Sequence, residues 1–152
     1  MNNQQVADIS AIVFIEADER LKQRVKGEWG KKAARHMHLT DGFSIVALEE
    51  DVLVGLISAY GKKLPLLETV DWYIDILEVH KDYRRKGIAT DLIRIVSERA
   101  KEAGIYQIRS WSSDDKVEAI PMWKALGFGF CPATTYPQGK EIKGYFVAKV
   151  VL

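Results

Sequence analysis

The chain has 152 residues, a net charge of +1 and 47% hydrophobic residues, which suits one domain with its own core. The near-neutral charge gives no reason to expect nucleic-acid or membrane binding. Its apolar stretches are strand-sized, and its first residues lack a secretory-signal pattern, so we expect a cytoplasmic protein. Cys131 is the only cysteine. The sequence therefore predicts no internal disulfide and no metal held by thiolates.

The first half of the chain predicts a strand, a helical region and a β-hairpin. The helical region is either one helix or two helices broken near Gly27 and Gly30. The hairpin turns across Glu49-Glu50-Asp51, and Pro65 marks an exposed turn. In chain order, the expected elements are a strand over 11–15, helix over 17–37, hairpin strands over 45–48 and 52–57, and the turn over 61–67.

The middle of the chain predicts a strand followed by a long helix. Residues 72–79 are rich in aromatic and β-branched side chains. Apolar residues between Ile88 and Ala103 recur at helical spacing, and Gly104 suits a C-cap. Alternation along the strand divides its side chains between two faces, with Trp72, Ile74 and Ile76 on one face and Tyr73, Asp75 and Leu77 on the other.

The last third predicts further strands around a second helical region. Pro121 lies inside this region, and proline in a helix interior removes a hydrogen bond at a cost of ~3 kcal/mol. We therefore expect a helix that starts late, rather than one kinked near Val117. The ranges are strand 106–111, helical region 112–126, and strands 128–131 and 145–151. Strands paired first by a hairpin and later joined through helices predict a mixed sheet in an α/β domain.

A basic loop separates the 72–79 strand from the long helix. Arg84, Arg85 and Lys86 precede Gly87, and the N–H groups at a helix N-terminus favour anions. Glycine at this position lets the backbone approach phosphate oxygens closely. The pattern indicates a site for a phosphorylated ligand. A solvated basic loop, with a glycine that merely starts a helix, remains the alternative.

Two motifs resemble one known family. Arg84-x-x-Gly87-x-Ala89, after Val79-His80-Lys81-Asp82-Tyr83, resembles the acetyl-CoA pyrophosphate motif of the GNAT-type N-acetyltransferase superfamily. Trp123-Lys124-Ala125-Leu126-Gly127-Phe128 resembles the helix-to-strand ending of that family's later cofactor-binding motif. The resemblance covers roughly residues 70–130. It implies a single acetyltransferase-like domain over 1–152, with a mixed, mostly antiparallel sheet flanked by helices and splayed central strands.

The resemblance also implies how coenzyme A would bind. The strand ending at Val79 would splay from the 106–111 strand, and the pantetheine arm would pair with backbone groups in the wedge. An N–H near Leu77 would hold the oxyanion. The pyrophosphate would rest on the amides of 85–90. The cofactor-binding residues implied are Leu77, Glu78, Val79, Arg84, Arg85, Lys86, Gly87, Ile88, Ala89, Thr90, Lys116 and Trp123.

The implied reaction needs a proton acceptor, because only about one alkylammonium in 2,500 is neutral at pH 7. Asp75 is the first candidate, since it shares a strand face with Leu77. The alternative is a carboxylate that is paired or simply solvated. Glu78 is the reserve candidate, because a bulge would reverse which residues face the cleft.

The chain departs from the family at two positions. Trp123 stands where the family often has a tyrosine that protonates the departing thiolate, and an indole N–H cannot do this. Tyr136 and Tyr145 are candidate substitutes. Lys116 stands where the family frequently has an asparagine that touches the cofactor. The other three tryptophans either line the bottom of an acceptor pocket or belong to the core; they are Trp29, Trp72 and Trp111.

We therefore expect an N-acetyltransferase that uses acetyl-CoA as cosubstrate, without a metal, and transfers the acetyl group by direct attack of a primary amine. The acceptor would be a small molecule or a peptide, with no nucleic acid or membrane as partner. The alternative is a non-catalytic acyl-CoA-binding sensor or regulatory module. The acceptor's identity, the acyl length, the general acid and the oligomeric state, including a homodimer, stay open.

Overall fold

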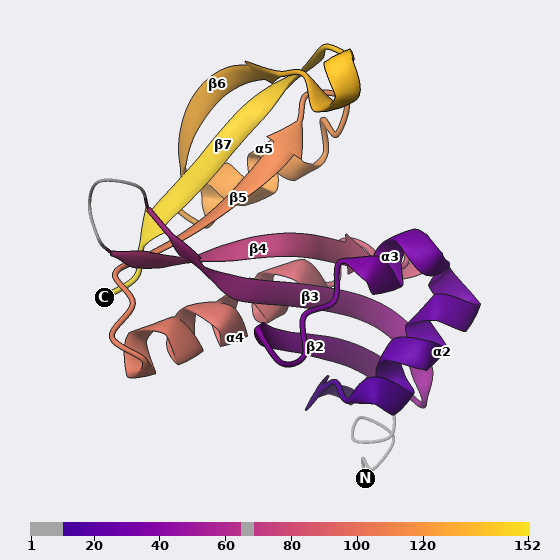
Figure 1. The fold of residues 1–152 in the computed structure, drawn as a ribbon. Helices are drawn as coiled ribbons and strands as arrows, with labels where there is room; N and C mark the ends of the chain where they lie inside the picture. Colours follow the sequence, from indigo (N-terminus) through magenta and orange to yellow (C-terminus); the bar gives the residue numbers. More distant parts are fainter. Residues whose placement is uncertain (1–10, 65–68) are drawn as a thin grey trace, which may run out of the picture. The chain divides into compact units, whose positions relative to one another are not determined.

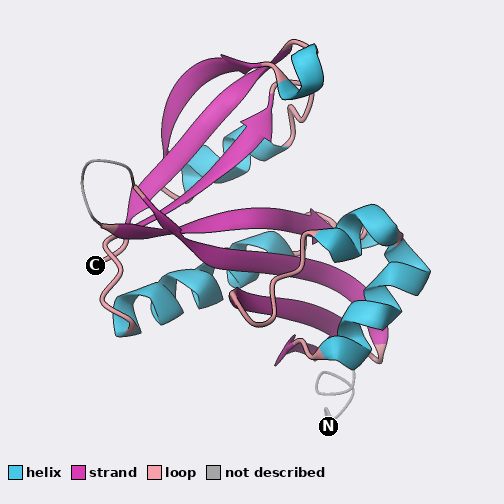
Figure 2. Cartoon of the chain, in the orientation of Figure 1, coloured by secondary structure: helices cyan, strands magenta, loops and turns pink. Residues whose placement is uncertain are grey.

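The computed structural model describes residues 11–64 and 69–152, which form one seven-stranded mixed sheet with helices. The strand order is β1-β2-β3-β4-β5-β7-β6 (Figure 1). β4 and β5 are parallel, whereas β1–β2, β5–β7 and β6–β7 are antiparallel. The elements are β1 (Ile12–Glu16), α2 (Glu19–Trp29), α3 (Lys31–Arg35), β2 (Gly42–Glu49), β3 (Val52–Lys63), β4 (Val70–Val79), α4 (Ile88–Glu102), β5 (Gln107–Ser113), α5 (Ala119–Ala125), β6 (Gly129–Thr135) and β7 (Ile142–Val150) (Figure 2). The predicted α/β mixed sheet is confirmed.

Several boundaries differ from the expected ones. The N-terminal helical region is broken at Gly30, whose φ is 103°, whereas Gly27 lies inside α2. β3 continues to Lys63, so the turn predicted over 61–67 was wrong in its first residues, and 65–68 lie outside the described residues. α5 begins at Ala119, which places Pro121 in its first turn. The late start of this helix is therefore confirmed.

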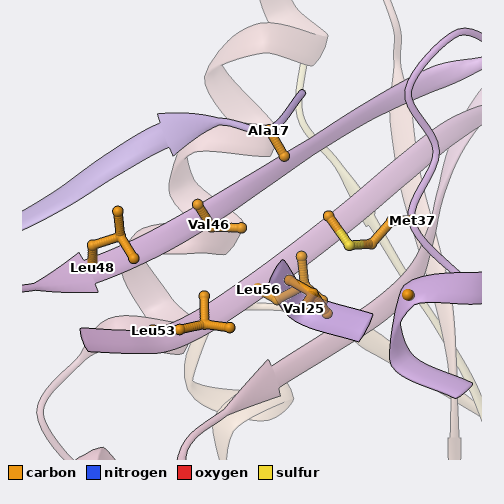
Figure 3. Close-up of a cluster of buried hydrophobic side chains, with 8 residues drawn as sticks. Ala17, Val25, Met37, Val46, Leu48, Leu53 and Leu56 are labelled. Atoms are coloured by element: carbon orange, nitrogen blue, oxygen red, sulfur yellow. The ribbon is translucent and has the colours of Figure 1, made fainter. Parts of the chain in front are cut away.

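The chain divides into two compact units. The first comprises residues up to Ser58 together with Ile76–Leu92, and the second comprises Ala59–Asp75 and Ile93–Leu152. The core of the first unit joins the helices to β2 and β3, with Val25 of α2 lying among Val46, Leu53 and Leu56 (Figure 3). Asp18 caps α2, because its Oδ1 accepts a 3.0 Å hydrogen bond from the Leu21 amide.

In the second unit, α5 contributes an aromatic contact to the core. Trp123 is 3% exposed, and its ring packs edge-on against Phe128 with 4.7 Å between centroids. Ile108 of β5 and Val147 of β7 are fully buried. Among residues 11–64 and 69–152, no helix is long and apolar enough to cross a membrane. Nor do three or more His, Cys, Asp or Glu side chains gather there in a way that could hold a metal ion.

Candidate active site

The basic loop forms a short, well-connected turn between β4 and α4. The amide of His80 donates to the Val54 carbonyl at 2.8 Å, which ties the end of β4 to β3. A 3₁₀ turn follows at Lys81–Tyr83, and His80 caps it because Nδ1 accepts a 3.1 Å hydrogen bond from the Asp82 amide. His80 is thus a structural residue of this loop, and its ring packs edge-on against Tyr83.

The N-terminus of α4 has backbone N–H groups that the helix itself does not use. The first hydrogen bond into the helix runs from the Asp91 amide to the Gly87 carbonyl at 2.9 Å. By helix geometry, the amides of Ile88, Ala89 and Thr90 therefore have no acceptor within the helix. Gly87 has φ of 80°, a left-handed conformation that L side chains adopt with strain. A Cβ there would meet no described atom within 4 Å, so the space beside the turn is open.

Arg85 is also left-handed, with φ of 65°. A non-glycine residue rarely takes this conformation, and it costs roughly 1–2 kcal/mol. Left-handed residues close together in a turn can direct successive amides toward one concave site that attracts anions. The helix dipole adds positive potential at the same end. The loop and the helix N-terminus together therefore have the properties of a phosphate-binding turn.

The first turn of α4 is packed closely against β3 at Gly55. A Cβ at Gly55 would lie 2.8 Å from Cγ2 of Ile88 and 3.2 Å from Cδ1 of Leu92. It would also lie 3.2 Å from Cβ of Ala47. Ile88 and Leu92 are 2% and 0% exposed. The position of the helix N-terminus thus depends on the absence of a side chain at residue 55.

The basic side chains of the loop have different surroundings. Nε of Arg84 donates to the Val79 carbonyl at 3.2 Å, so this arginine helps to hold the end of β4. Nζ of Lys86 lies 5.0 Å from the centre of the Tyr83 ring. Arg85 and Lys86 are exposed. Arg84 thus has a structural contact in addition to any charge that it offers a ligand.

The three candidate catalytic residues lie in different surroundings. Asp75 and Glu78 are both half-buried on β4, and alternation along the strand places them on opposite faces. Tyr136 lies between β6 and β7 and is 62% exposed. Tyr145, the other candidate phenol, is half-buried against Phe130.

A group of polar and aromatic side chains around Tyr73 was not predicted from the sequence. The Tyr73 ring meets Tyr60 edge-on with 5.9 Å between centroids, and Nζ of Lys62 lies 4.9 Å from the Tyr73 ring centre. Burial raises the pKa of Tyr73, and the negative charge of Asp75 raises it further. The phenol is therefore protonated at neutral pH. Alternation had placed Tyr73 on the same face as Asp75, which is the signal that could have identified it.

A buried ion pair lies where β4 and β5 run parallel. Trp72 pairs with Ile108 and Tyr73 pairs with Arg109. Nε of Arg109 lies 2.9 Å from Oδ2 of Asp71, and Gln107 donates to the same oxygen at 2.6 Å. Asp71 is 4% exposed. These contacts stabilise the parallel pairing beside Tyr73.

The remaining candidate cofactor-binding residues differ in exposure and in their contacts. Lys116 is exposed in the turn before α5, where its amide donates to the Ser113 carbonyl at 3.1 Å. Trp123 is buried against Phe128, which favours the core role over a wall beside pantetheine. Leu77 and Val79 are half-buried at the end of β4.

Comparison with known proteins identifies the class. Residues 4–128 match the acetyltransferase (GNAT) family. The chain therefore belongs to this family. Its sequence is 30% identical over 92 residues to N-alpha-acetyltransferase 30 of Schizosaccharomyces pombe, covering 60% of this chain and 61% of that protein. It is 31% identical over 75 residues to the tRNA(Met) cytidine acetyltransferase TmcA of Aeropyrum pernix, covering 49% of this chain and 10% of that one.

The fold is similar to that of solved acetyltransferases. Arabidopsis thaliana Naa50, solved in complex with the bisubstrate analogue CoA-Ac-MVNAL, has a TM-score of 0.73 and 19% identity. The similarity covers 93% of this chain and 99% of that one. At this level of identity the comparison shows the fold alone. The predicted GNAT-like fold is thus confirmed, whereas the individual site residues stay predictions.

Proposed function

We propose that this protein transfers an acetyl group from acetyl-CoA to a primary amine. The observation that carries the proposal is the N-terminus of α4, where Gly87 is left-handed and the amides of Ile88, Ala89 and Thr90 are not used by the helix. Such a turn suits a diphosphate, and family membership suggests the diphosphate of coenzyme A. Arg85 and Lys86 would add charge-assisted contacts.

In the proposed complex, the pantetheine arm extends from this turn along the end of β4. The backbone of Leu77 and Val79 would hold the arm, and the Leu77 amide would stabilise the oxyanion. The amine nitrogen attacks the thioester carbonyl, and the tetrahedral intermediate then collapses with cleavage of the C–S bond. The products are an amide and coenzyme A, so no covalent enzyme intermediate is needed.

The nitrogen loses two protons in these steps, one before attack and one from the tetrahedral intermediate, and the departing sulfur takes up one. Asp75 would take the ammonium proton, directly or through a water, and Glu78 remains the reserve. The thiol of coenzyme A has a pKa of ~8.5, so its thiolate leaves with only modest help from an acid. Tyr73 joins Tyr136 and Tyr145 as a candidate acid, because its raised pKa keeps the phenol protonated.

Two classes of amine fit the proposed role of acceptor. Naa50 was solved with an analogue that joins coenzyme A to the peptide MVNAL, which supports a peptide α-amine as one acceptor class. A small-molecule amine is the other. We also propose that residues 1–152 act as one acetyltransferase-like domain in the cytoplasm, with neither metal nor nucleic acid taking part.

Two measurements test the proposal. Calorimetry shows whether coenzyme A and acetyl-CoA bind, and a release assay over a panel of amines shows whether coenzyme A is formed. Cys131 is an exposed free thiol, so thiol detection needs a blank without amine. Binding of coenzyme A together with turnover of an amine supports the transferase. Binding without turnover of any amine would favour the acyl-CoA sensor, and no binding at all would overturn both.

A further inference from the structure

The parallel ladder between β4 and β5 stops before either strand ends. Its last pair is Tyr73 with Arg109, both in the second unit. β4 continues from there to Val79, and β5 continues to Ser113. The backbone groups that follow the last pair therefore need partners other than this ladder, because buried N–H and C=O groups are nearly always hydrogen-bonded.

Ser110 supplies one such partner with its side chain. Its Oγ donates to the carbonyl of Ile74 at 2.9 Å. These two residues would form the next pair of the ladder, and both are buried, with Ile74 1% and Ser110 5% exposed. A carbonyl at such a site needs a donor, since an unpaired buried acceptor is costly. A hydroxyl thus stands where a longer ladder would place a backbone N–H.

The pairing of β5 with β7 shows which backbone groups of β5 face β4. The register with β7 is unbroken along the whole of β5. Just before β5, the Val151 amide donates to the Tyr106 carbonyl at 2.7 Å. Just after β5, the Asp114 amide donates to the Lys143 carbonyl at 3.0 Å. Bonded residues alternate along an antiparallel strand, so the amide of Trp111 points away from β7 and towards the β4 side.

In a longer ladder, the Trp111 amide would donate to the Ile74 carbonyl. A parallel ladder joins each residue to the two that flank its opposite, and Trp111 flanks Ser110. The pairing stops one step short of this bond, and the Ser110 hydroxyl is the donor to that carbonyl instead. In the part of the chain that the structure describes, strand pairing thus gives the Trp111 amide no acceptor.

The surroundings of this amide suit an uncharged chain that carries amide groups. The half-buried Trp111 ring packs against Phe146, with 4.9 Å between centroids. The carboxylate of Asp71, at the β4–β5 pairing, is neutralised by Arg109 at 2.9 Å. The pantetheine arm of coenzyme A is such a chain, and its amide carbonyls can accept from a strand as an added strand would.

We propose that Ser110 is a positioning residue for the pantetheine arm of coenzyme A. Its hydroxyl ends the β4–β5 ladder at Tyr73 and so leaves the Trp111 amide to donate to a carbonyl of the arm. This inference rests on the proposed use of acetyl-CoA. Ser110 acts through the backbone and touches neither the thioester nor the amine.

Loss of the hydroxyl should extend the ladder by one step. The buried Ile74 carbonyl would then take the Trp111 amide as its donor, and the arm would lose that hydrogen bond. One neutral hydrogen bond corresponds to about a fivefold change in affinity. The phosphate-binding turn before α4 contains neither Ser110 nor Trp111, so its affinity for a diphosphate should stay the same.

The test compares Ser110→Thr with Ser110→Val, because the two side chains have nearly the same shape and differ in the hydroxyl. Calorimetry measures the affinity for coenzyme A and for adenosine 3′-phosphate 5′-diphosphate, which keeps the phosphates but lacks the arm. We expect the Val variant to bind coenzyme A about fivefold more weakly than the Thr variant, and both to bind the nucleotide alike. The KM for acetyl-CoA should rise by the same factor, with kcat unchanged.

Ser97→Ala is the matched control. Ser97 donates to the Ile93 carbonyl at 2.8 Å within α4, so this change also removes a hydroxyl from a carbonyl of the second unit. It should change the affinity for neither ligand. Hydrogen exchange followed by NMR reports on the backbone directly. The Trp111 amide of the parent protein should exchange rapidly without ligand and slowly with coenzyme A, whereas in Ser110→Val it should exchange slowly in both states.

The outcomes separate this inference from the proposed function. Equal coenzyme A affinities of the Thr and Val variants, or a loss that the nucleotide shares, overturn the inference and leave acetyl transfer standing. A Trp111 amide already protected in the ligand-free parent does the same. If neither variant folds, exchange of the parent's Trp111 amide with and without coenzyme A decides. Binding without turnover of any amine removes the transferase but not this inference, which compares binding alone, and no binding of coenzyme A overturns both.

Discussion

Gly55→Ala is the sharpest test of how the turn before α4, the proposed coenzyme A site, is held in place. The added methyl group would lie 2.8 Å from Cγ2 of Ile88, in the first turn of α4. This is roughly 0.7 Å closer than two carbons prefer. Since Ala47 and Leu92 close the other sides at 3.2 Å each, the helix end must move away from β3.

The expected cost has two parts. Overpacking of a filled core site destabilises a protein by ~1–3 kcal/mol. Displacement of the Ile88, Ala89 and Thr90 amides by a similar distance would lengthen hydrogen bonds to a phosphate well beyond ~3.0 Å, where they weaken steeply. Losing one charge-assisted bond of ~1.5 kcal/mol would lower the affinity for coenzyme A about tenfold.

Gly27→Ala is the matched control. Gly27 lies inside α2, and a Cβ there would meet nothing within 4 Å, so alanine should raise stability by about 1 kcal/mol through helix propensity. Coenzyme A affinity should not change. Urea unfolding measures stability, and calorimetry measures affinity. A Gly55→Ala variant that binds coenzyme A as tightly as the parent would refute the view that this close contact positions the turn.

Three further predictions concern single residues. Gly87→Glu should abolish coenzyme A binding in calorimetry through like-charge repulsion, whereas Gly87→Ala should cost only the strain of a left-handed residue, ~1–2 kcal/mol. Equal binding losses in the two variants would argue against a phosphate at this turn. Asp75→Asn should keep coenzyme A affinity but lower turnover, most visibly below the pKa of the amine. Unchanged pH–rate behaviour would remove Asp75 from the mechanism, and Glu78→Gln then tests the reserve. The Tyr73 pKa is raised on folding, so this residue stabilises the fold fully below pH ~10 and loses the contribution as pH rises through the folded-state pKa. Tyr73→Phe should therefore flatten the fall in unfolding free energy above pH 10, and an unchanged slope would contradict the shift.

Local features of the fold could be predicted from the sequence. A strand, a basic loop, a glycine and a helix follow one another within about 30 residues, and each is determined largely by near neighbours. The left-handed Gly87 and the unused amides after it lie where the pattern placed them. The late start of α5 followed from the constraint that Pro121 imposes on its own backbone.

Features that depend on distant residues could not be predicted in this way. The close contact at Gly55 requires α4 to pack on β3, and Asp71 meets Arg109 only because β4 and β5 align. The position of the break between α2 and α3, at Gly30 and not at Gly27, also depends on distant residues. Both are glycines, but a turn after Trp29 lets Ala34 reach the core of the first unit.

For the general acid of the proposed reaction, the structure offers a candidate residue that the sequence did not. Trp123 is buried, and its indole N–H cannot protonate a departing thiolate. Tyr136 is 62% exposed, and such a phenol keeps contact with bulk water. Tyr73 is instead half-buried, protonated and on the Asp75 face of β4. Strand residues rise ~3.3 Å each, so Tyr73, Asp75 and Leu77 follow one another at ~6.6 Å intervals along one face. A phenol and a carboxylate on one face of this strand would thus supply the acid and the base of the proposed transfer without any contribution from Trp123.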